Sequence, residues 1–478
     1  MVASPQLKWF GLALLAAVQF MVVLDIAIVN VALPSIQTDL DFSQANLQWV
    51  ISAYALVFGG FLLLGGRSAD LLGRRRVFMI GLIAFLIGSL LCGLAWSEAS
   101  LIGARAIQGL GAATISPAAL AILMTTFAEG RERNIALGVW GAVGGFGAAA
   151  GVLLGGVLTD ALSWEWIFFV NIPVALAAFA LAPVLLGESR DTRVKSFDAF
   201  GAVLVTAGLS TLVLGITQGH TWGWDSARTI GVFVLSVALL AGFVGWENRV
   251  DEPLMRFGIL RTKTVLGANV SGFILGTALF SMFLMLTLYM QQVLGYSAMK
   301  TGVAYLAVAG TSIIWANVAA ALVSRVGVRP LIAGGMAILS IGMVLFAQVE
   351  VGGSYARDLL PGFLIVAFGM AMCFVPISIA ALAGVSRAEA GIASGLINTS
   401  QQIGGAVGIA LLSTVAITRT ENEVAAGTDM PHALTSGFQI AFWVGAAIAA
   451  VGAVAALVLI RQEEVAATEG EPQPVLAA

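Results

Sequence analysis

Two charged residues stand inside runs of the sequence that are otherwise apolar. Asp25 lies in "FMVVLDIAIVNVALP" and Arg105 lies in "LIGARAIQGLGAA". A charge in an apolar environment is costly unless it is paired with an opposite charge or faces water. Burial favours the protonated form of a carboxyl group, and a nearby cation favours the ionised form. A carboxyl group beside a guanidinium can therefore exchange a proton when its surroundings change.

Neutral hydrogen-bonding side chains accompany the two charges in the same runs. Gln19 and Asn30 flank Asp25 along the chain, and Gln108 follows Arg105 by three residues. These amides can support a proton-exchanging pair, and they can equally form a purely structural polar network within a membrane. Because ionisable residues inside membranes are usually functional, we favour the proton-exchanging interpretation.

The composition requires a membrane around these residues. The chain has 478 residues, of which 59% are hydrophobic and 10% are charged. Since a bilayer needs about 20 apolar residues for each helical crossing, we predict an all-α, multi-pass membrane protein with fourteen spans: 9–33, 46–66, 77–96, 101–125, 135–159, 166–187, 199–217, 228–247, 266–293, 302–323, 331–349, 358–384, 392–418 and 435–460.

The distribution of basic residues predicts the orientation of these spans. Eighteen of the 23 lysines and arginines fall in alternate loops, four fall in the opposite loops or at span edges, and Arg105 lies inside a span. Cytoplasmic loops are enriched in Lys and Arg, so both termini are predicted to be cytoplasmic. With about 1.5 Å of rise per residue, Asp25 and Arg105 then come to similar depths.

An internal repeat predicts how the spans are grouped. The loop "SADLLGRRRVFMIGLI" is echoed by "LVSRVGVRPLIAGGMAI", which retains the glycine and basic residues. Repeats of this kind are typical of transporters built from two related halves. We predict a six-helix bundle over 1–190, two inserted helices with linkers over 191–262, a second six-helix bundle over 263–462 and a disordered tail over 463–478.

Other classes of protein have little support in the sequence. A net charge of −3 without a long basic tract gives no reason to expect nucleic acid. Two cysteines and two histidines are too few for a metal cluster, and we expect no metal and no cofactor. A channel would need a continuous polar pore. An intramembrane enzyme would need a nucleophile or a metal-binding motif.

Two further segments have patterns with mechanical meaning. Asp70 in "GGRSADLLGRRR" precedes a run of arginines and can form a charge network that holds two helices in one arrangement. Gly147, Gly151 and Gly155 recur at four-residue spacing, which allows another helix to approach closely. In "GLINTSQQIGG", three amides occupy one helical face, which indicates a cavity wall or hydrogen bonding between helices: Asn398, Gln401 and Gln402.

Five segments in order resemble the major facilitator superfamily, and within it the fourteen-helix drug/proton antiporters of the EmrB/QacA type. The segments are "LDIAIVNVALP", "GGRSADLLGRRR", "RAIQGLGAA", "SWEWIFFVNIPV" and "GLINTSQQIGG". The resemblance implies proton coupling through Asp25 and Arg105, supported by Asn30, Gln108 and Gly109. It also implies a conformational latch made of Gly66, Asp70, Gly73, Arg74 and Arg75. It implies a helix-packing motif made of Gly147, Gly151, Gly155 and Gly156. The implied substrate cavity is lined by Gln19, Tyr54, Asn398, Gln401 and Gln402.

Two positions depart from the family pattern. Val152 follows Gly151 where the family usually has proline, so the kink that proline causes is not expected. Leu71 follows Asp70 where a basic residue is usual, so one contact of the latch is not expected.

The resemblance implies a proton-coupled exporter of amphipathic, largely hydrophobic small molecules in the cell membrane, contributing to drug or antibiotic resistance. We expect it to work as a monomer. The alternative on the same scaffold is an exporter of a lipid, an endogenous metabolite or an antibiotic. The expected partners are a small-molecule substrate, protons and the lipid bilayer.

Overall fold

A computed structural model describes residues 5–127, 130–190, 198–251, 253–255, 257–385 and 390–461. Every regular element in these ranges is a helix, which confirms the all-α prediction. The predicted tail 463–478 and part of the predicted linker, 191–197, lie outside the described residues.

The first half of the chain forms six long helices and two short ones. Ser97 begins one of them with a capping box, because its side chain accepts the Ser100 N–H while the Ser100 hydroxyl accepts the Ser97 N–H. The elements are α1 (Pro5–Asp39), α2 (Gln44–Leu47), α3 (Trp49–Leu72), α4 (Arg74–Gly93), α5 (Glu98–Thr126), α6 (Arg131–Ala161), α7 (Trp166–Phe169) and α8 (Asn171–Leu185).

The remaining helices comprise the inserted pair and the second half of the chain. The pair predicted to be inserted, and so called below, is α9 (Ala199–Trp222) and α10 (Ala227–Glu247), which pack on each other, followed by the short η1 (Phe257–Arg261). The second half contains α11 (Lys263–Leu288), η2 (Tyr289–Val293), α12 (Ala298–Val326), α13 (Val328–Phe346), η3 (Tyr355–Leu359), α14 (Leu360–Ala380), α15 (Ala390–Ala425) and α16 (Met430–Leu459).

Thirteen of the described helical segments are long and apolar enough to cross a membrane. The described part of α6 adds a shorter apolar stretch, Phe146–Ala161, which agrees with fourteen crossings. The expected span 166–187 contains two helices, because the helix is interrupted at Val170 between α7 and α8. The helix α1 is longer than its expected span, 9–33, at both ends.

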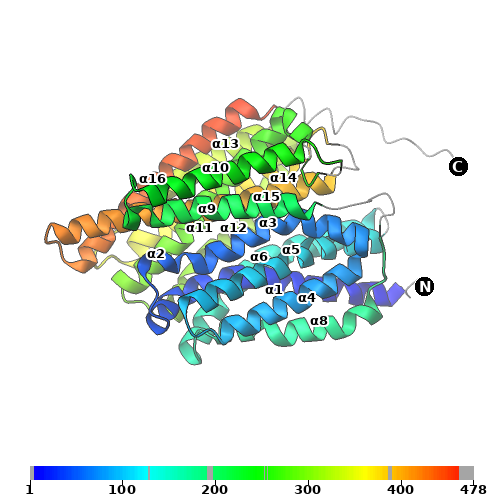
Figure 1. Cartoon of the computed structure of the whole chain (residues 1–478), viewed down its shortest axis with the longest axis horizontal. Coiled ribbons are helices and arrows are strands. Elements are labelled where there is room, and N and C mark those ends of the chain that lie inside the picture. Colours follow the sequence, from blue (N-terminus) through cyan, green and yellow to red (C-terminus); the bar gives the residue numbers. More distant parts are fainter. Residues whose placement is uncertain are drawn as a thin grey trace.

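The two halves repeat one pattern of helix pairing. In the first half α1 packs on α6 and α3 on α5, and in the second half α11 packs on α15 and α12 on α14. The echoed loops also match, because Gly73 and Gly327 both have positive φ, of 111° and 83°, a conformation that glycine adopts without strain. Figure 1 shows the first half, in blue and cyan, lying below the second half.

Two lines of contact join the halves. The helix α6 packs on α12, and α3 packs on α15 and on the inserted helix α9. The α15–α16 connection, drawn in orange, projects beyond the neighbouring helices in Figure 1. The buried charged residues described in the first half, Asp25 and Arg105, lie on α1 and α5.

A candidate proton-coupling site in the first helical bundle

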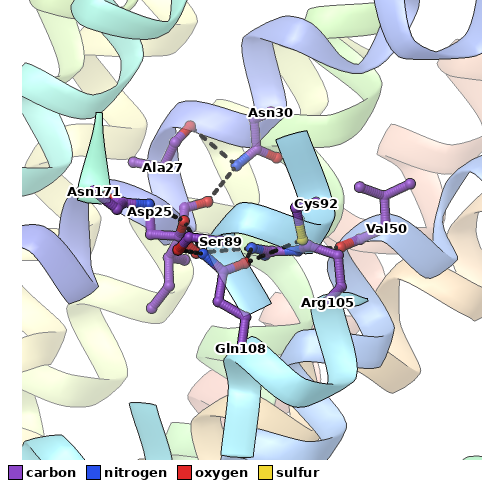
Figure 2. Close-up of polar contacts among 10 residues, drawn as sticks. Asp25, Ala27, Asn30, Val50, Ser89, Cys92, Arg105, Gln108 and Asn171 are labelled. Atoms are coloured by element: carbon purple, nitrogen blue, oxygen red, sulfur yellow. Dashed lines mark hydrogen bonds and ion pairs between the residues drawn. The ribbon is translucent and has the colours of Figure 1, made fainter. Parts of the chain in front are cut away.

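Asp25 is fully buried and its carboxylate accepts hydrogen bonds from three side chains. Arg105 Nη1 donates to Oδ2 over 2.7 Å, Gln108 Nε2 donates to Oδ1 over 2.6 Å and Asn171 Nδ2 donates to Oδ1 over 2.8 Å. Figure 2 shows these groups converging on the carboxylate. Both oxygens are thus hydrogen-bonded, and the negative charge is paired with a guanidinium that is itself 1% exposed.

Arg105 has acceptors other than Asp25. Its Nε donates to the Val50 carbonyl oxygen over 2.9 Å, and its Nη1 also donates to Gln108 Oε1 over 2.6 Å. The guanidinium lies over the Tyr54 ring, 4.3 Å from the ring centroid, a geometry in which the ring attracts a cation. The cation therefore has neutral partners in addition to Asp25.

Five helices supply the groups of this site. Asp25 lies on α1, Val50 and Tyr54 lie on α3, and Arg105 lies on α5 with Gln108 one turn later. The helix α4 contributes Ser89, whose hydroxyl accepts from Gln108 Nε2 over 2.9 Å, and α8 begins with Asn171. The geometry of the site therefore depends on the relative positions of these five helices.

Gly109 allows two of these helices to approach closely. A Cβ atom at this position of α5 would lie 2.6 Å from the Tyr54 carbonyl oxygen, which real side chains do not tolerate. The absence of a side chain thus keeps the α3 backbone, including the Val50 acceptor, within reach of Arg105. Gly109 supports the site through packing and has no polar side chain to contribute.

Sequence reasoning missed three contributors to the site. Asn171 is the one polar residue in "IFFVNIPV", the same signal that singled out Asp25, so it could have been found. Ser89 stands in an apolar run, but serine is common in membrane helices and carries little signal. The Val50 carbonyl oxygen has no signal, because a backbone acceptor is set by helix packing.

Two of the predicted amides lie apart from the carboxylate. Asn30 donates to the backbone oxygens of Ile26 and Ala27 on its own helix, and Figure 2 shows its side chain away from Asp25. Gln19 accepts a hydrogen bond from the Ser116 hydroxyl over 3.3 Å. The structure thus brings Asp25, Arg105, Gln108 and Gly109 together, with Asn30 outside the network.

The predicted latch residues form a charge network at the end of α3. Arg74 pairs with Asp70 over 2.7 Å, and Arg75 Nη1 donates to the Leu186 carbonyl oxygen over 3.0 Å. The backbone N–H groups of Arg75 and Arg76 donate to Glu188.

Two glycines of the latch serve backbone geometry. Gly73 ends α3 with its positive φ, and its position faces the Glu188 carboxylate. A Cβ atom at Gly66 would lie 3.5 Å from the Cβ atom of Pro117 on α5. The described contacts of the latch join α3, α4, α5 and the end of α8 within the first half of the chain.

The glycines of α6 divide between two neighbours. Cβ atoms at Gly147, Gly151 and Gly155 would meet α1 at Val23, Ala27 and the Ile28 carbonyl oxygen, at 3.2, 2.7 and 2.6 Å. A Cβ atom at Gly156 would instead lie 2.6 Å from the Ala298 carbonyl oxygen of α12. This helix therefore packs on α1 with one face and on the second half of the chain with another. The helix α6 is continuous through Val152, whose carbonyl oxygen lies against Gly302 of α12.

The predicted cavity residues lie in different surroundings. Tyr54 is buried against Arg105. Asn398 is exposed and donates to the Ser394 carbonyl oxygen of its own helix. Gln401 packs on α11 beside Gly272 and Gly276, whereas Gln402 faces Gly59 of α3 and its Oε1 is buried without a hydrogen-bond partner.

The fold and the site together define a class of protein. Two repeated sets of membrane-spanning helices, with one ion pair buried among the spans of one set, are typical of secondary transporters. Among the described residues no group of three or more His, Cys, Asp or Glu side chains is placed to hold a metal ion.

The chain belongs to the major facilitator superfamily, whose family model matches residues 15–409. It is a multi-pass membrane transporter and not an enzyme, as the sequence predicted. Similar proteins include the puromycin resistance protein pur8 of Streptomyces alboniger, 40% identical over 471 residues, which are 97% of this chain and 93% of that protein. Another is the cephamycin export protein CmcT of Amycolatopsis lactamdurans, 40% identical over 85% of this chain and 84% of that protein.

Solved structures share the fold at low sequence identity. An auto-inhibited peptide transporter of the POT family superposes with a TM-score of 0.67 and 17% identity, covering 99% of each chain. A mutant of the nucleoside transporter NupG gives a TM-score of 0.67 at 12% identity, covering 95% of this chain and 100% of that chain. These likenesses establish the architecture, whereas the resemblance to export and resistance proteins bears on function.

Proposed function

We propose that the protein is a proton-coupled exporter of amphipathic, largely hydrophobic small molecules, including antibiotics, from the cytoplasm. It works as a monomer with both termini in the cytoplasm, by rocking the bundle of helices α1 to α8 against the bundle of helices α11 to α16. The single observation that carries the proposal is the buried Asp25–Arg105 pair with its neutral hydrogen-bonding partners.

The arrangement of donors and acceptors supports exchange of a proton at Asp25. When Asp25 is ionised, Arg105, Gln108 and Asn171 satisfy both of its oxygens. When Asp25 takes up a proton, its attraction for Arg105 falls, and the guanidinium keeps the Val50 carbonyl oxygen, Gln108 Oε1 and the Tyr54 ring. The protonated state leaves Arg105 without a counter-ion, and these neutral contacts offset part of that cost.

Stability alone does not account for such a pair. Replacing a buried ion pair by well-packed apolar residues is often neutral or stabilising, by about 1–4 kcal/mol. An apolar bundle of the same shape would hold together without the pair. A role in exchanging protons explains why the charges are present in a segment where they are expensive.

Contacts between the bundles support an inward-facing arrangement. Gln291 Nε2 donates to the Val31 carbonyl oxygen over 2.8 Å, and the N–H groups of Ala298 and Met299 donate to Asp160 over 3.2 and 2.9 Å. All these residues lie near the predicted outer ends of their helices. The two bundles are therefore joined on the predicted outer side.

The inner parts of two of these helices are more open. Along α6 and α12, Gly156 and Gly302 face the opposite bundle closely, at the Ala298 and Val152 carbonyl oxygens. Gly138 and Gly310 lie farther toward the predicted cytoplasmic side, and a Cβ atom at either would have nothing within 4 Å. This contrast supports an opening toward the cytoplasm, from which an exporter would take its substrate.

The driving force fits export against a gradient. Each proton that enters through a potential of 100 mV supplies about 2.3 kcal/mol. This free energy can sustain roughly a fiftyfold gradient of an exported molecule per proton. Binding of an external proton by Asp25 would weaken the tie to Arg105 and favour the return of the empty carrier to the inward-facing state.

Lipid or metabolite export is the second candidate function, and one experiment separates the two. The purified protein is reconstituted in proteoliposomes with an imposed pH gradient, and accumulation of puromycin and of cationic dyes is compared with transfer of labelled lipids. We expect accumulation of drugs or dyes that depends on the gradient. Movement of lipids alone would favour the second candidate, and no gradient-dependent movement of any small molecule would overturn the proposal.

A further inference from the structure

A second pair of buried acidic side chains lies in the inserted helices, far from Asp25 along the chain. Asp198 is the N-cap residue of α9 and Glu247 is the last residue of α10. The residues are only 5% and 4% exposed. Both occupy the end of the inserted pair that is predicted to be cytoplasmic. Two acids so fully buried need donors or a proton.

Asp198 has the donors that an ionised carboxylate requires. The Gly201 N–H donates to its Oδ1 over 2.8 Å, and the indole Nε1 of Trp246 lies 2.9 Å from each of its two oxygens. The carboxylate therefore caps the first turn of α9 and is held by a side chain of α10.

Glu247 is satisfied on one oxygen only. Its Oε2 accepts the Met255 N–H over 3.0 Å, whereas its Oε1 is buried without a hydrogen-bond partner. A Cβ atom at Gly201 would collide with Asp198 Oδ2 and would lie 2.6 Å from Glu247 Oε1, so the two oxygens converge on the same small space. The unpartnered oxygen thus points at the neighbouring carboxylate.

A shared proton resolves this arrangement. Two carboxylates in contact cannot both be ionised at low cost, and a proton on one makes it a hydrogen-bond donor to the other. With the proton on Glu247, its hydroxyl donates to Asp198, and every polar atom of the pair then has a partner. We propose that Asp198 and Glu247 form a second proton-binding site, separate from Asp25 and open to control by the cytoplasmic pH.

Among the residues that the structure describes, the other charged groups nearby do not replace that proton. Arg249 and Asp251, which follow Glu247 along the chain, are exposed. Arg67 of α3 donates through Nη2 to the Pro253 carbonyl oxygen over 3.3 Å. The groups described around the pair from α9, from α10 and from the segment after α10 are the amides of Gly201, Leu254 and Met255 and the indole of Trp246.

The position of the pair gives the proton a mechanical consequence. Glu247 holds Met255, and Arg67 holds Pro253, so the segment after α10 is tied to α10 and to α3. The helix α3 also carries Val50, the acceptor of Arg105, and Gly59, whose carbonyl oxygen accepts from Thr399 of the second bundle. Loss of the shared proton would set two negative charges against each other and loosen the start of α9 from the end of α10.

Infrared titration of the purified full-length protein in detergent tests this inference without any transport. A protonated carboxyl group absorbs apart from carboxylates, so its C=O band should disappear as the pH is raised. We expect Glu247→Gln to lose the part of this band that belongs to the pair, and Asp198→Asn to shift the pH at which that part disappears. The matched control, Glu188→Gln just after α8, should leave the band unchanged.

The outcomes separate a proton site from a merely structural contact. A band and a titration that are the same in Glu247→Gln and in the unmodified protein would overturn the inference. If Glu247→Gln is not recovered folded, Asp198→Asn decides alone, since an unshifted titration in that variant contradicts a shared proton. Repeating the titration in an Asp25→Asn background removes any contribution from the first site, so the result does not depend on the proposed function.

Discussion

The two bundles share one plan of helix packing and differ in charge. In the first bundle Gly155 lets α6 approach Ile28 of α1, and in the second Gly408 lets α15 approach Thr277 of α11. Only the first holds a deeply buried ion pair among the described residues, Asp25 with Arg105. The buried side chains with polar groups that are described between residues 263 and 461 are uncharged: Asn, Ser and Thr residues, with the hydroxyls of Tyr289 and Tyr305.

This difference shows that the fold does not need the charges. The second bundle satisfies its polar groups with neutral hydrogen bonds, such as the Tyr305 hydroxyl, which lies 2.9 Å from Thr287 Oγ1 and donates to the Phe283 carbonyl oxygen. Neutral pairs cannot exchange a proton near neutral pH. The first bundle, with its buried ion pair, is therefore the part that can respond to protons. The second bundle, whose described buried polar groups are uncharged, serves as the comparison.

Removal of the cation should have the largest effect. In Arg105→Met, Asp25 remains buried without its counter-ion, and we expect a loss of about 3–5 kcal/mol in the free energy of unfolding together with loss of gradient-driven efflux. The double variant Asp25→Leu/Arg105→Met should recover most of the stability and none of the transport. Unfolding in detergent and efflux in cells measure the two quantities. Transport by the double variant would contradict a coupling role for the pair.

Helix packing should respond equally in the two bundles. Gly155→Ala and Gly408→Ala each place a Cβ atom 2.6 Å from backbone of the partner helix, and overpacking of this kind costs about 1–3 kcal/mol. Gly138→Ala is the matched control in α6, since nothing lies within 4 Å of its position. The control should be neutral or slightly stabilising, because alanine favours helix. Equal stability of all three variants in thermal unfolding would show that the close approaches do not matter.

The outer contact between the bundles should be weaker. Asp160→Ala removes the carboxylate that accepts the N–H groups of Ala298 and Met299 at the start of α12. Loss of such a capping interaction costs about 1 kcal/mol. In Asp160→Ala, we expect the spin-label distances between the outer ends of α6 and α12 to lengthen or their distribution to broaden. Asp160→Asn keeps an acceptor oxygen, so its distances should lie between those of Asp160→Ala and those of the unmodified protein. Unchanged distances in Asp160→Ala would show that this contact does not hold the outer ends of the two bundles together.

The smallest effect should come from the neutral network. Tyr305→Phe removes one hydroxyl from the pair with Thr287, and we expect a loss of about 0.5–1.5 kcal/mol in stability. Gradient-driven efflux should stay within about twofold of the unmodified protein, since about 0.4 kcal/mol corresponds to a factor of about two. A loss of efflux as large as that expected for Arg105→Met would show that the second bundle also takes part in coupling.

Much of this fold could be predicted from the sequence, because each membrane-spanning helix requires a long run of apolar residues. Long apolar runs predicted the helices, and the charge at residue 25 stood out against its neighbours for the same reason. The pairing of Asp25 with Arg105 followed from their similar depths and opposite charges. Burial of polar groups in an apolar solvent is expensive, so each such residue carries information.

The details that depend on packing could not be predicted. Asn30 lies one turn and a half from Asp25 along α1, yet it faces backbone oxygens of its own helix, because the rotation of a helix decides which side chains converge. The Val50 carbonyl oxygen and the neighbours of Gly156 depend on helix contacts that no local pattern specifies. The Asp198–Glu247 contact joins two helix ends 49 positions apart in sequence numbering, both at span edges where acids are common.

The most direct test of the account compares two modes of transport in Asp25→Asn. The variant and the unmodified protein are reconstituted in proteoliposomes, and each is assayed for accumulation driven by a pH gradient and for exchange of labelled against unlabelled substrate without a gradient. The account predicts that Asp25→Asn retains exchange and loses accumulation. Accumulation by the variant that responds to the pH gradient as in the unmodified protein would contradict it.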